Sequence, residues 1–505
     1  IFILAAALMC GVVAFGQNIP QYHDTEIEAS KEYVEGNAYQ RDLLLYADML
    51  GDTHPYFADA SHRKALDRQA KKLYRECGTI DDVKEFKLTL AKLAASLGDG
   101  HTAIYYWSAP DRIFPVRFNF GVDGRVVVDL CQEEYRTILG KEVATLNGKT
   151  VKQLMAMARE VVSADNDVNF LNLVTDYLLL TDFWGLLGMS SEELNVGFAD
   201  GSDATIVTIN KSELKIAQLQ NDLSGRVTSP RRVLFDYTIH EDEGICYLQF
   251  NQFADRVTHP NNPQLPRFDE FVCQMMNDIE VKGVKTLVVD LQYNSGGNSS
   301  LGDVLLSWLK PYDEIKQYSA EVRISELMLA YYPYYKEFTC DGKPLEVGKV
   351  YSAREFDHNR AADDDIVVQQ DSTHHVLNYD NERIFKGDVV FIQSRESFSS
   401  ASLLLTTARD NGIGCIVGER SGGRPSHYGD ILYCTLPNTG TIATVSHKRF
   451  IRPDHAKVDD EYLEPNIFVP LNNPDRDVVW ESILDLFGPS KSKQFVAQKN
   501  DDDSY

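Results

Sequence analysis

The sequence is poor in basic residues and in long hydrophobic runs, and each shortage excludes a class of protein. Its 505 residues include 50 Lys and Arg against 75 Asp and Glu, which gives a formal net charge of −25. Because such a chain repels polyphosphate and has no clustered basic stretch, we predict that it binds no nucleic acid. With 43% hydrophobic and 25% charged residues, the composition is that of a globular protein, and the length suggests roughly three domains.

One apolar run stands at the start of the sequence, over residues 1–15 (IFILAAALMCGVVAF). It has the length of the apolar part of a signal peptide, and Ala14–Gly16 forms a small-x-small cleavage site. We therefore predict a signal peptide over 1–17 and a secreted or periplasmic protein with no integral membrane segment after signal removal. A buried N-terminal helix is the alternative. A lipoprotein anchor at Cys10 is disfavoured because Met9 stands where a small residue is expected.

The chain also lacks a cysteine framework. Apart from Cys10, its cysteines are widely scattered, and no two of them form a CxxC pair. This pattern argues against a zinc site or a disulfide scaffold. Cysteines inside apolar runs, such as Cys246 and Cys415, are expected to serve as small core residues. We predict neither a metal site nor a cofactor.

Hydrophobic periodicity changes along the chain and indicates its organisation. Phe86, Leu90, Leu93 and Leu97 have helical spacing behind the capping candidates Asp81 and Asp82, whereas the chain after about residue 233 alternates between strands and helices. Such alternation predicts an α/β fold with a parallel sheet. The predicted parts are a signal peptide (1–17), an N-terminal helical region (18–112), a mixed domain (113–215), an α/β core (216–490) with an excursion at 313–385, and a tail (491–505).

Two turns of the α/β core follow buried strands and carry polar residues. The apolar run 284–291 leads into the glycine turn Asn294–Gly297, and the strand Asp388–Gln393 leads into the serine-rich segment Ser394–Ser402. Adjacent parallel strands end at one sheet edge, and a helix that starts there offers N–H groups to an oxyanion. A helix cap and a plain glycine turn are the alternative interpretations.

Four short segments give the chain a resemblance to the C-terminal (tail-specific) processing and tricorn-type serine peptidases. Asp290–Gly297 (DLQYNSGG) is similar to the family's D-L-R-x-N-x-G-G, and Ser397–Ser402 (SFSSAS) is similar to T-[AF]-S-[AS]-[AS]-E. Val417–Gly422 (VGERSG) is similar to V-G-E-x-T-x-G, and Asp99–Thr102 (DGHT) is similar to D-x-H-[TS]. Gln292 in place of the usual Arg, and Ser402 in place of the acid, depart from the pattern.

The resemblance implies a crotonase-like (ClpP-like) α/β core, with an N-terminal helical region and a PDZ-like domain over 113–215 that would hold a peptide C-terminus. It implies Ser399 as the nucleophile, with the backbone N–H groups of Ser400 and of Gly296 or Gly297 as oxyanion donors.

The resemblance offers two ways of activating the serine. Tail-specific members use a lysine 25 residues downstream, but Arg424 stands there and cannot act as a base. Tricorn-like members use the histidine of the D-x-H element, here His101. The supporting acid would be Asp459, with Asp460 and Glu461 as competitors, ahead of the degraded element Tyr462–Asn466. His427 is the second candidate for the base, ahead of His447, and Arg424 is a candidate for substrate binding.

The implied function is a secreted serine endopeptidase that hydrolyses peptides or unfolded protein tails through an acyl-enzyme. The alternative is a catalytically inactive protein with the same core that binds retinoids, other lipophiles or peptides. A crotonase-type acyl-CoA enzyme is disfavoured because export separates the chain from cytosolic CoA.

Overall fold

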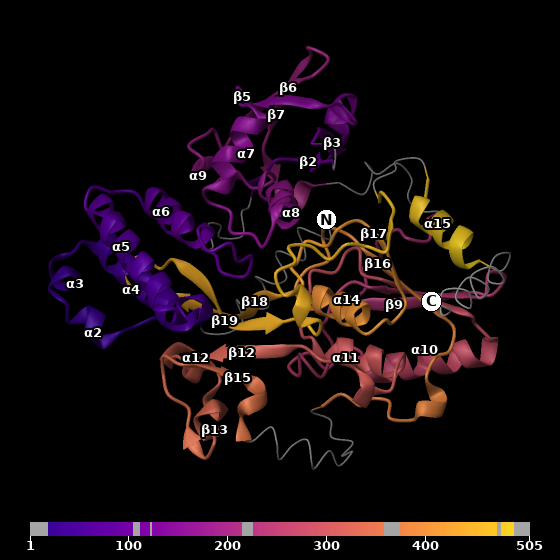
Figure 1. Cartoon of the computed structure of the whole chain (residues 1–505). Coiled ribbons are helices and arrows are strands. Elements are labelled where there is room, and N and C mark those ends of the chain that lie inside the picture. The colour runs from indigo at the N-terminus through magenta and orange to yellow at the C-terminus, as the bar shows by residue number, and fades with distance from the viewer. Residues whose placement is uncertain are drawn as a thin grey trace.

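The computed structural model describes residues 19–104, 112–121, 124–214, 226–357, 374–471 and 476–488 (Figure 1). The predicted signal peptide and the predicted tail lie outside these residues. None of the helices in the described ranges combines the length and the apolarity that crossing a bilayer requires.

The N-terminal region is helical and leads toward the centre of the molecule (Figure 1, indigo). Its helices are α2 (Thr25–Glu28), α3 (Lys31–Glu35), α4 (Ala38–Thr53), α5 (Ala60–Cys77) and α6 (Val83–Ala95). Helix α6 starts behind the capping side chain of Asp82, as predicted, and buries Phe86, Leu90 and Leu93. A short 3-10 helix, η1 (Pro55–Ala58), joins α4 to α5.

The next part of the chain, residues 112–214, contains short strands and three helices and lies above the core in Figure 1. Its elements are β1 (Arg112–Ile113), β2 (Val116–Phe120), β3 (Val126–Cys131), β4 (Val143–Leu146), β5 (Lys149–Thr150), α7 (Val151–Arg159), α8 (Asp167–Tyr177), α9 (Thr181–Leu186), β6 (Glu193–Phe198), β7 (Asp203–Val207) and β8 (Ile209–Asn210). Strands β5, β4, β6 and β7 form one sheet in that order. Asn147 and Gly148, both with positive φ, make the predicted tight turn between β4 and β5.

A six-stranded sheet forms the α/β core. Its order is β20 (Ile467–Phe468), β17 (Cys415–Gly418), β16 (Asp388–Gln393), β11 (Thr286–Asp290), β10 (Ile245–Phe250) and β9 (Phe235–His240). Only the β9–β10 pair is antiparallel. Helices α10 (Phe268–Lys282), α11 (Ser300–Ser307) and α14 (Ser400–Asp410) pack in one apolar cluster with the sheet, and α15 (Val478–Phe487) packs in another. The sheet is therefore covered on both faces, which explains the continuous apolar run through β11.

A second, antiparallel sheet joins the core to the N-terminal helices. Its order is β15 (Val350–Ser352), β12 (Ser319–Arg323), β19 (Ile442–Ile451) and β18 (His427–Thr435). Leu432 and Val445 of this sheet share an apolar cluster with Leu43 and Met49 of α4. The region 313–385 also contains α12 (Glu326–Tyr331), β13 (Thr339–Cys340) and β14 (Lys343–Pro344). Two of its strands, β12 and β15, pair into the second sheet, so this region is built into the fold.

Candidate active site

Ser399 occupies the turn between β16 and α14, with φ 52° and ψ −122°. Positive φ strains a non-glycine residue, and such strain persists where surrounding contacts hold it. The N–H of Phe398 donates to the carbonyl oxygen of Asn294 at 3.1 Å. Ser397 Oγ donates to the carbonyl oxygen of Leu291 at 2.8 Å. Since β11 and β16 are neighbouring parallel strands, the serine turn and the glycine turn meet at one sheet edge, as the sequence predicted.

His101 reaches the same edge from the loop that follows α6. Its Nε2 lies 3.0 Å from Ser399 Oγ. The loop is fastened to β19, because Thr444 Oγ1 donates to the carbonyl oxygen of His101 at 3.0 Å. The N–H of Ser446 also donates to Thr102 Oγ1 at 3.1 Å. An imidazole at this distance from a serine hydroxyl is the arrangement that activates a serine nucleophile.

Two buried carboxylates, those of Asp99 and Asp165, lie near the other ring nitrogen of His101. His101 Nδ1 has no hydrogen-bond partner within the described ranges, and Asp99 Oδ1 lies 3.6 Å from it. One ligand atom from each of Asp99, His101 and Asp165 lies within 4.8 Å of the others, which is the composition of a metal site. We assign no metal to it because Asp99 already accepts hydrogen bonds from four groups: His54 Nε2, the His101 N–H, Thr102 Oγ1 and Ser446 Oγ.

Burial and charge act in opposite directions on these groups. Burial lowers the pKa of His101, but Asp99, with Asp165 and Asp430, outweighs burial and raises this pKa above its ordinary value. Burial raises the pKa of Asp99, whereas the adjacent His101 and His54 bring it well below its usual range. Burial, reinforced by the charge of Asp99, raises the pKa of Asp165 to about 6. Asp99 is therefore the carboxylate that stays ionised beside the imidazole.

None of the three acids that the resemblance placed near residue 459 has a contact with His101 within the described residues. Asp459 is exposed. Asp460 binds Arg452 at 2.9 Å, and Arg452 also binds Asp410. Asp410 is the last residue of α14, whereas Ser399 immediately precedes its first residue. The ion pairs with Arg452 therefore hold Asp460 near the end of α14 that lies opposite Ser399.

Arg424 lies beside Asp165. Its Nε donates to the carbonyl oxygen of Asp165, and its backbone N–H donates to Asp165 Oδ2 at 3.4 Å. The guanidinium also faces Glu461 at 3.6 Å. The structure therefore engages Arg424 in internal contacts next to the site.

The other two candidate histidines do not bond to the serine. His427 stacks on His101 with ring centres 5.6 Å apart, and its Nδ1 lies 2.9 Å from the carbonyl oxygen of Arg424. Burial lowers the pKa of His427 to about 3, so this ring stays neutral. His447 Nδ1 lies 2.6 Å from the carbonyl oxygen of Asp430.

The glycine turn supplies backbone N–H groups near Ser399. Gly296 uses its N–H to bond Asn294 Oδ1 at 2.8 Å. The N–H groups of Gly297 and Ser400 donate to no other group in the described part of the chain. Gly297 bridges to Phe253 on one side, so its own N–H points away from that strand. Gly297 and Ser400 therefore leave two backbone N–H groups free beside Ser399, and a pair of this kind can bind an oxyanion.

The two residues that depart from the family pattern, Gln292 and Ser402, form hydrogen bonds within the protein. Gln292, where the family has Arg, donates its Nε2 to Asp290 Oδ2 at 3.0 Å. Ser402, where the family has an acid, donates its Oγ to the carbonyl oxygen of Ser397 at 3.2 Å. Both side chains are buried. Neither side chain forms a hydrogen bond to Ser399 within the described residues.

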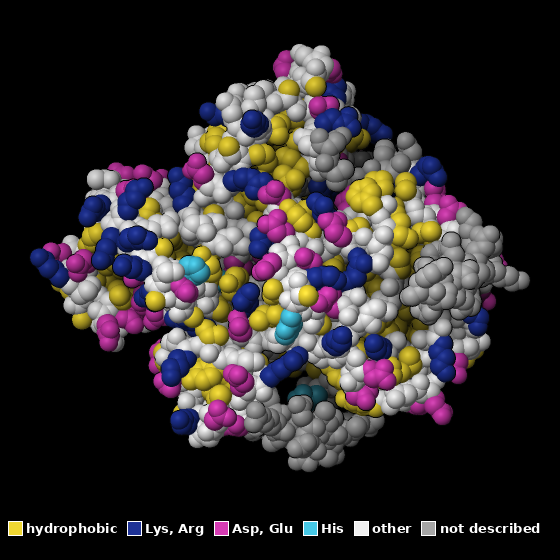
Figure 2. All heavy atoms as spheres, viewed as in Figure 1, with side chains coloured by type: hydrophobic (Ala, Val, Ile, Leu, Met, Phe, Trp, Pro, Cys, Tyr) yellow, Lys and Arg dark blue, Asp and Glu magenta, His cyan; other side chains and the backbone are white. Residues whose placement is uncertain are grey.

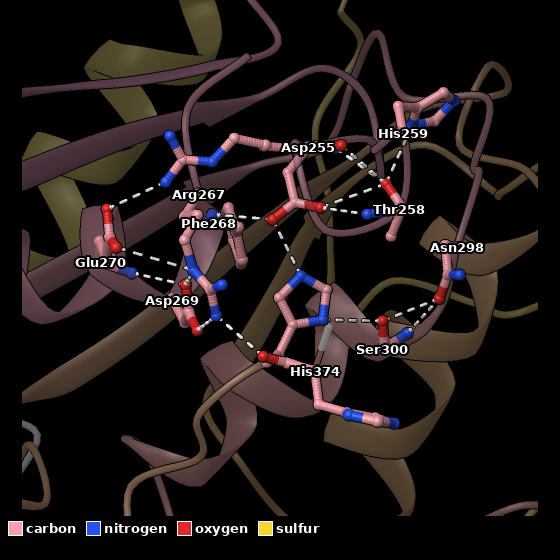
Figure 3. Close-up of polar contacts among 12 residues, drawn as sticks. Asp255, Thr258, His259, Arg267, Phe268, Asp269, Glu270, Asn298, Ser300 and His374 are labelled. Carbon is pink, nitrogen blue, oxygen red and sulfur yellow. Dashed lines mark hydrogen bonds and ion pairs between the residues drawn. The ribbon is translucent and has the colours of Figure 1, made fainter. Parts of the chain in front are cut away.

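A second set of Ser, His and Asp side chains lies at the start of α11 (Figure 3). His375 Nε2 lies 2.8 Å from Asp255 Oδ2, and His375 Nδ1 lies 3.1 Å from Ser300 Oγ. The N–H groups of Ser300 and Leu301 both donate to Asn298, at 3.1 and 3.4 Å. Because these two N–H groups are already engaged, we interpret this group, the His375 clasp, as a structural fastening.

The sequence motifs missed three residues of the site. Asp99 is part of the D-x-H element, but the motif assigned it no role, and its position two residues before His101 was the only indication that it supports the histidine. Asp165 and His54 belong to no motif, and only the folded chain brings them to His101 and Asp99.

Residues 244–469 match the sequence profile of peptidase family S41. The match identifies this part of the chain as a serine peptidase. No curated protein matches the chain.

Solved structures of CPAF share the fold around this peptidase domain. Mature CPAF is 15% identical over 93% of this chain and 98% of its own, with a TM-score of 0.60. Mature CPAF complexed with lactacystin is 14% identical over 91% and 98%, with a TM-score of 0.60. A CPAF mutant is 14% identical over 91% and 97%, with a TM-score of 0.62. At these identities the likeness concerns the fold, a mixed α/β fold with an N-terminal helical region.

Proposed function

We propose that this serine peptidase is an exported endopeptidase that cleaves peptides or unfolded protein tails through an acyl-enzyme. The observation that carries the proposal is the 3.0 Å contact between His101 Nε2 and Ser399 Oγ on a strained turn. The unengaged N–H groups of Gly297 and Ser400 support it. Export rests on the signal-like sequence at residues 1–17.

In the proposed reaction, His101 accepts the hydroxyl proton of Ser399 while Oγ attacks the substrate carbonyl carbon. The N–H groups of Gly297 and Ser400 stabilise the oxyanion. Asp99, rather than Asp459, orients the imidazole and stabilises its protonated form, because Asp99 is the ionised carboxylate at 3.6 Å. The imidazolium then protonates the leaving amine. Water hydrolyses the acyl-enzyme with His101 again as the base.

We place the protein in the tricorn-like, histidine-using branch of the family, with Arg424 where tail-specific enzymes have lysine. We also propose that residues 113–215 act as a PDZ-like domain. The β5–β4–β6–β7 sheet with α7 beside it supports this, since such a domain adds an extended peptide to a sheet edge. Under this proposal the domain captures substrate tails before cleavage.

The test compares Ser399→Ala with Ser300→Ala, because both serines contact a histidine that lies near a carboxylate. With labelled unfolded casein as substrate, Ser399→Ala is expected to lose about 10³-fold or more in kcat. Ser300→Ala is expected to keep its activity, and a fluorophosphonate probe should label wild type and Ser300→Ala but not Ser399→Ala. Unchanged turnover in Ser399→Ala would refute the assignment, and so would a wild type that neither cleaves casein nor takes up the probe.

A further inference from the structure

His54 connects the N-terminal helical region to the site. It follows α4 and precedes η1, and it is fully buried. Its Nε2 lies 3.1 Å from Asp99 Oδ2. The ring packs against Tyr428 with ring centres 4.4 Å apart and against Phe57 at 6.0 Å, so its orientation is fixed on both sides.

The backbone decides which nitrogen of His54 carries the proton. The N–H of Tyr56 donates to His54 Nδ1 at 3.2 Å, so Nδ1 acts as an acceptor. In a neutral imidazole the proton then resides on Nε2, which donates to Asp99 Oδ2. An ionised carboxylate only accepts, so the direction of this bond is fixed. A continuous series of contacts therefore runs from the Tyr56 N–H through His54 and Asp99 to His101 and Ser399.

The source of the donors to Asp99 makes His54 distinctive. The His101 N–H and Thr102 Oγ1 come from the same loop as Asp99, and Ser446 Oγ comes from β19. His54 alone among these four donors comes from the junction between α4 and η1. It bonds Oδ2, while Oδ1 faces His101 Nδ1 at 3.6 Å. Fixing one oxygen by a rigid ring fixes the direction in which the other oxygen points.

We propose that His54 is a positioning residue of the peptidase, which holds the Asp99 carboxylate in the orientation that supports His101. The proposal rests on the proposed reaction. It gives the junction between α4 and η1 a part in catalysis, in addition to the loop after α6 that carries Asp99 and His101.

The test uses three replacements of His54. Gln places an amide nitrogen near the Nε2 position and keeps the donor, whereas Leu fills the space without a donor. Asn is too short to reach Asp99. We expect His54→Leu and His54→Asn to lower kcat about 10–100-fold with little change in KM, as replacement of residues that orient a catalytic group commonly does. His54→Gln should recover most of the rate. His62→Leu on α5 is the matched control, because His62 Nδ1 contacts the Tyr56 carbonyl oxygen and not Asp99.

The pH profile separates positioning from simple loss of structure. A carboxylate that has turned away from His101 stabilises the imidazolium less and lowers the pKa of His101. The acid limb of kcat/KM should therefore move to lower pH in His54→Asn and return in His54→Gln. Thermal unfolding identifies any variant that does not fold. If His54→Leu does not fold, the comparison of His54→Asn with His54→Gln tests the proposal. Wild-type kcat and pH profile in His54→Asn would overturn the proposal for His54, while the Ser399→Ala result would leave the proposed function standing.

Discussion

Replacing Asp99 by Asn should remove most of the activity without unfolding the protein. The carboxylate lies 3.6 Å from His101 Nδ1, and both groups are buried. At an effective dielectric constant of about 20, this attraction stabilises the imidazolium by about 4–5 kcal/mol. The imidazolium forms only as the serine proton moves, so the loss falls on kcat and amounts to about 10³-fold. Asn keeps one oxygen that accepts from His54, Thr102 or Ser446, which limits the structural cost.

The assay is the initial rate of casein cleavage, fitted for kcat and KM separately, with thermal unfolding as the check on folding. Asp165→Asn is the matched comparison, because burial raises the pKa of that carboxyl group to about 6 and leaves it less completely ionised near neutral pH. We expect a smaller loss in Asp165→Asn than in Asp99→Asn. A folded Asp99→Asn that keeps more than about a tenth of the wild-type kcat would show that another group supports His101.

Two further predictions concern the base and the oxyanion turn. Asp99 raises the pKa of His101 despite burial, so kcat/KM should fall as the pH drops through a value above the ordinary histidine pKa of about 6.5. An acid limb at or below pH 6 would contradict this prediction. In Asp99→Asn the acid limb should move to lower pH. Gly296→Ala should abolish probe labelling of Ser399 and lower the melting temperature. Gly296 has φ 108°, and an added Cβ would lie 2.7 Å from the Cβ of Ser399. Labelling at the wild-type rate would show that the glycine turn can shift without displacing Ser399.

The sequence predicted the two turns well because each is a local feature. A buried strand followed by glycines or serines specifies its own turn, and neighbouring parallel strands bring the turns together. His101 could be predicted from the sequence because the D-x-H element stands directly after the end of a helix. The supporting carboxylate was harder to identify, because Asp99 stands two residues before His101 and no sequence pattern showed that its side chain faces the ring. Asp165 and His54 are far from His101 in sequence and come near it only when the chain folds. The motif near Asp459 gave a position along the chain but could not show that Arg452 and Asp410 tie that segment to the far end of α14.

The His375 clasp has a consequence for the integrity of the chain. His374, His375 and Val376 bond to Arg267, Asp255 and Asp269, at 2.8 Å in each case. Asn378 adds a bond from its N–H to Ser307 Oγ at 2.9 Å. These contacts hold residues 374–378 to Asp255, to the start of α10 and to α11 independently of the covalent connection through 358–373. On the other side of that connection, β15 is held by its pairing with β12. Cleavage of a single peptide bond within 358–373 would therefore leave two fragments that stay noncovalently associated and separate only on denaturation.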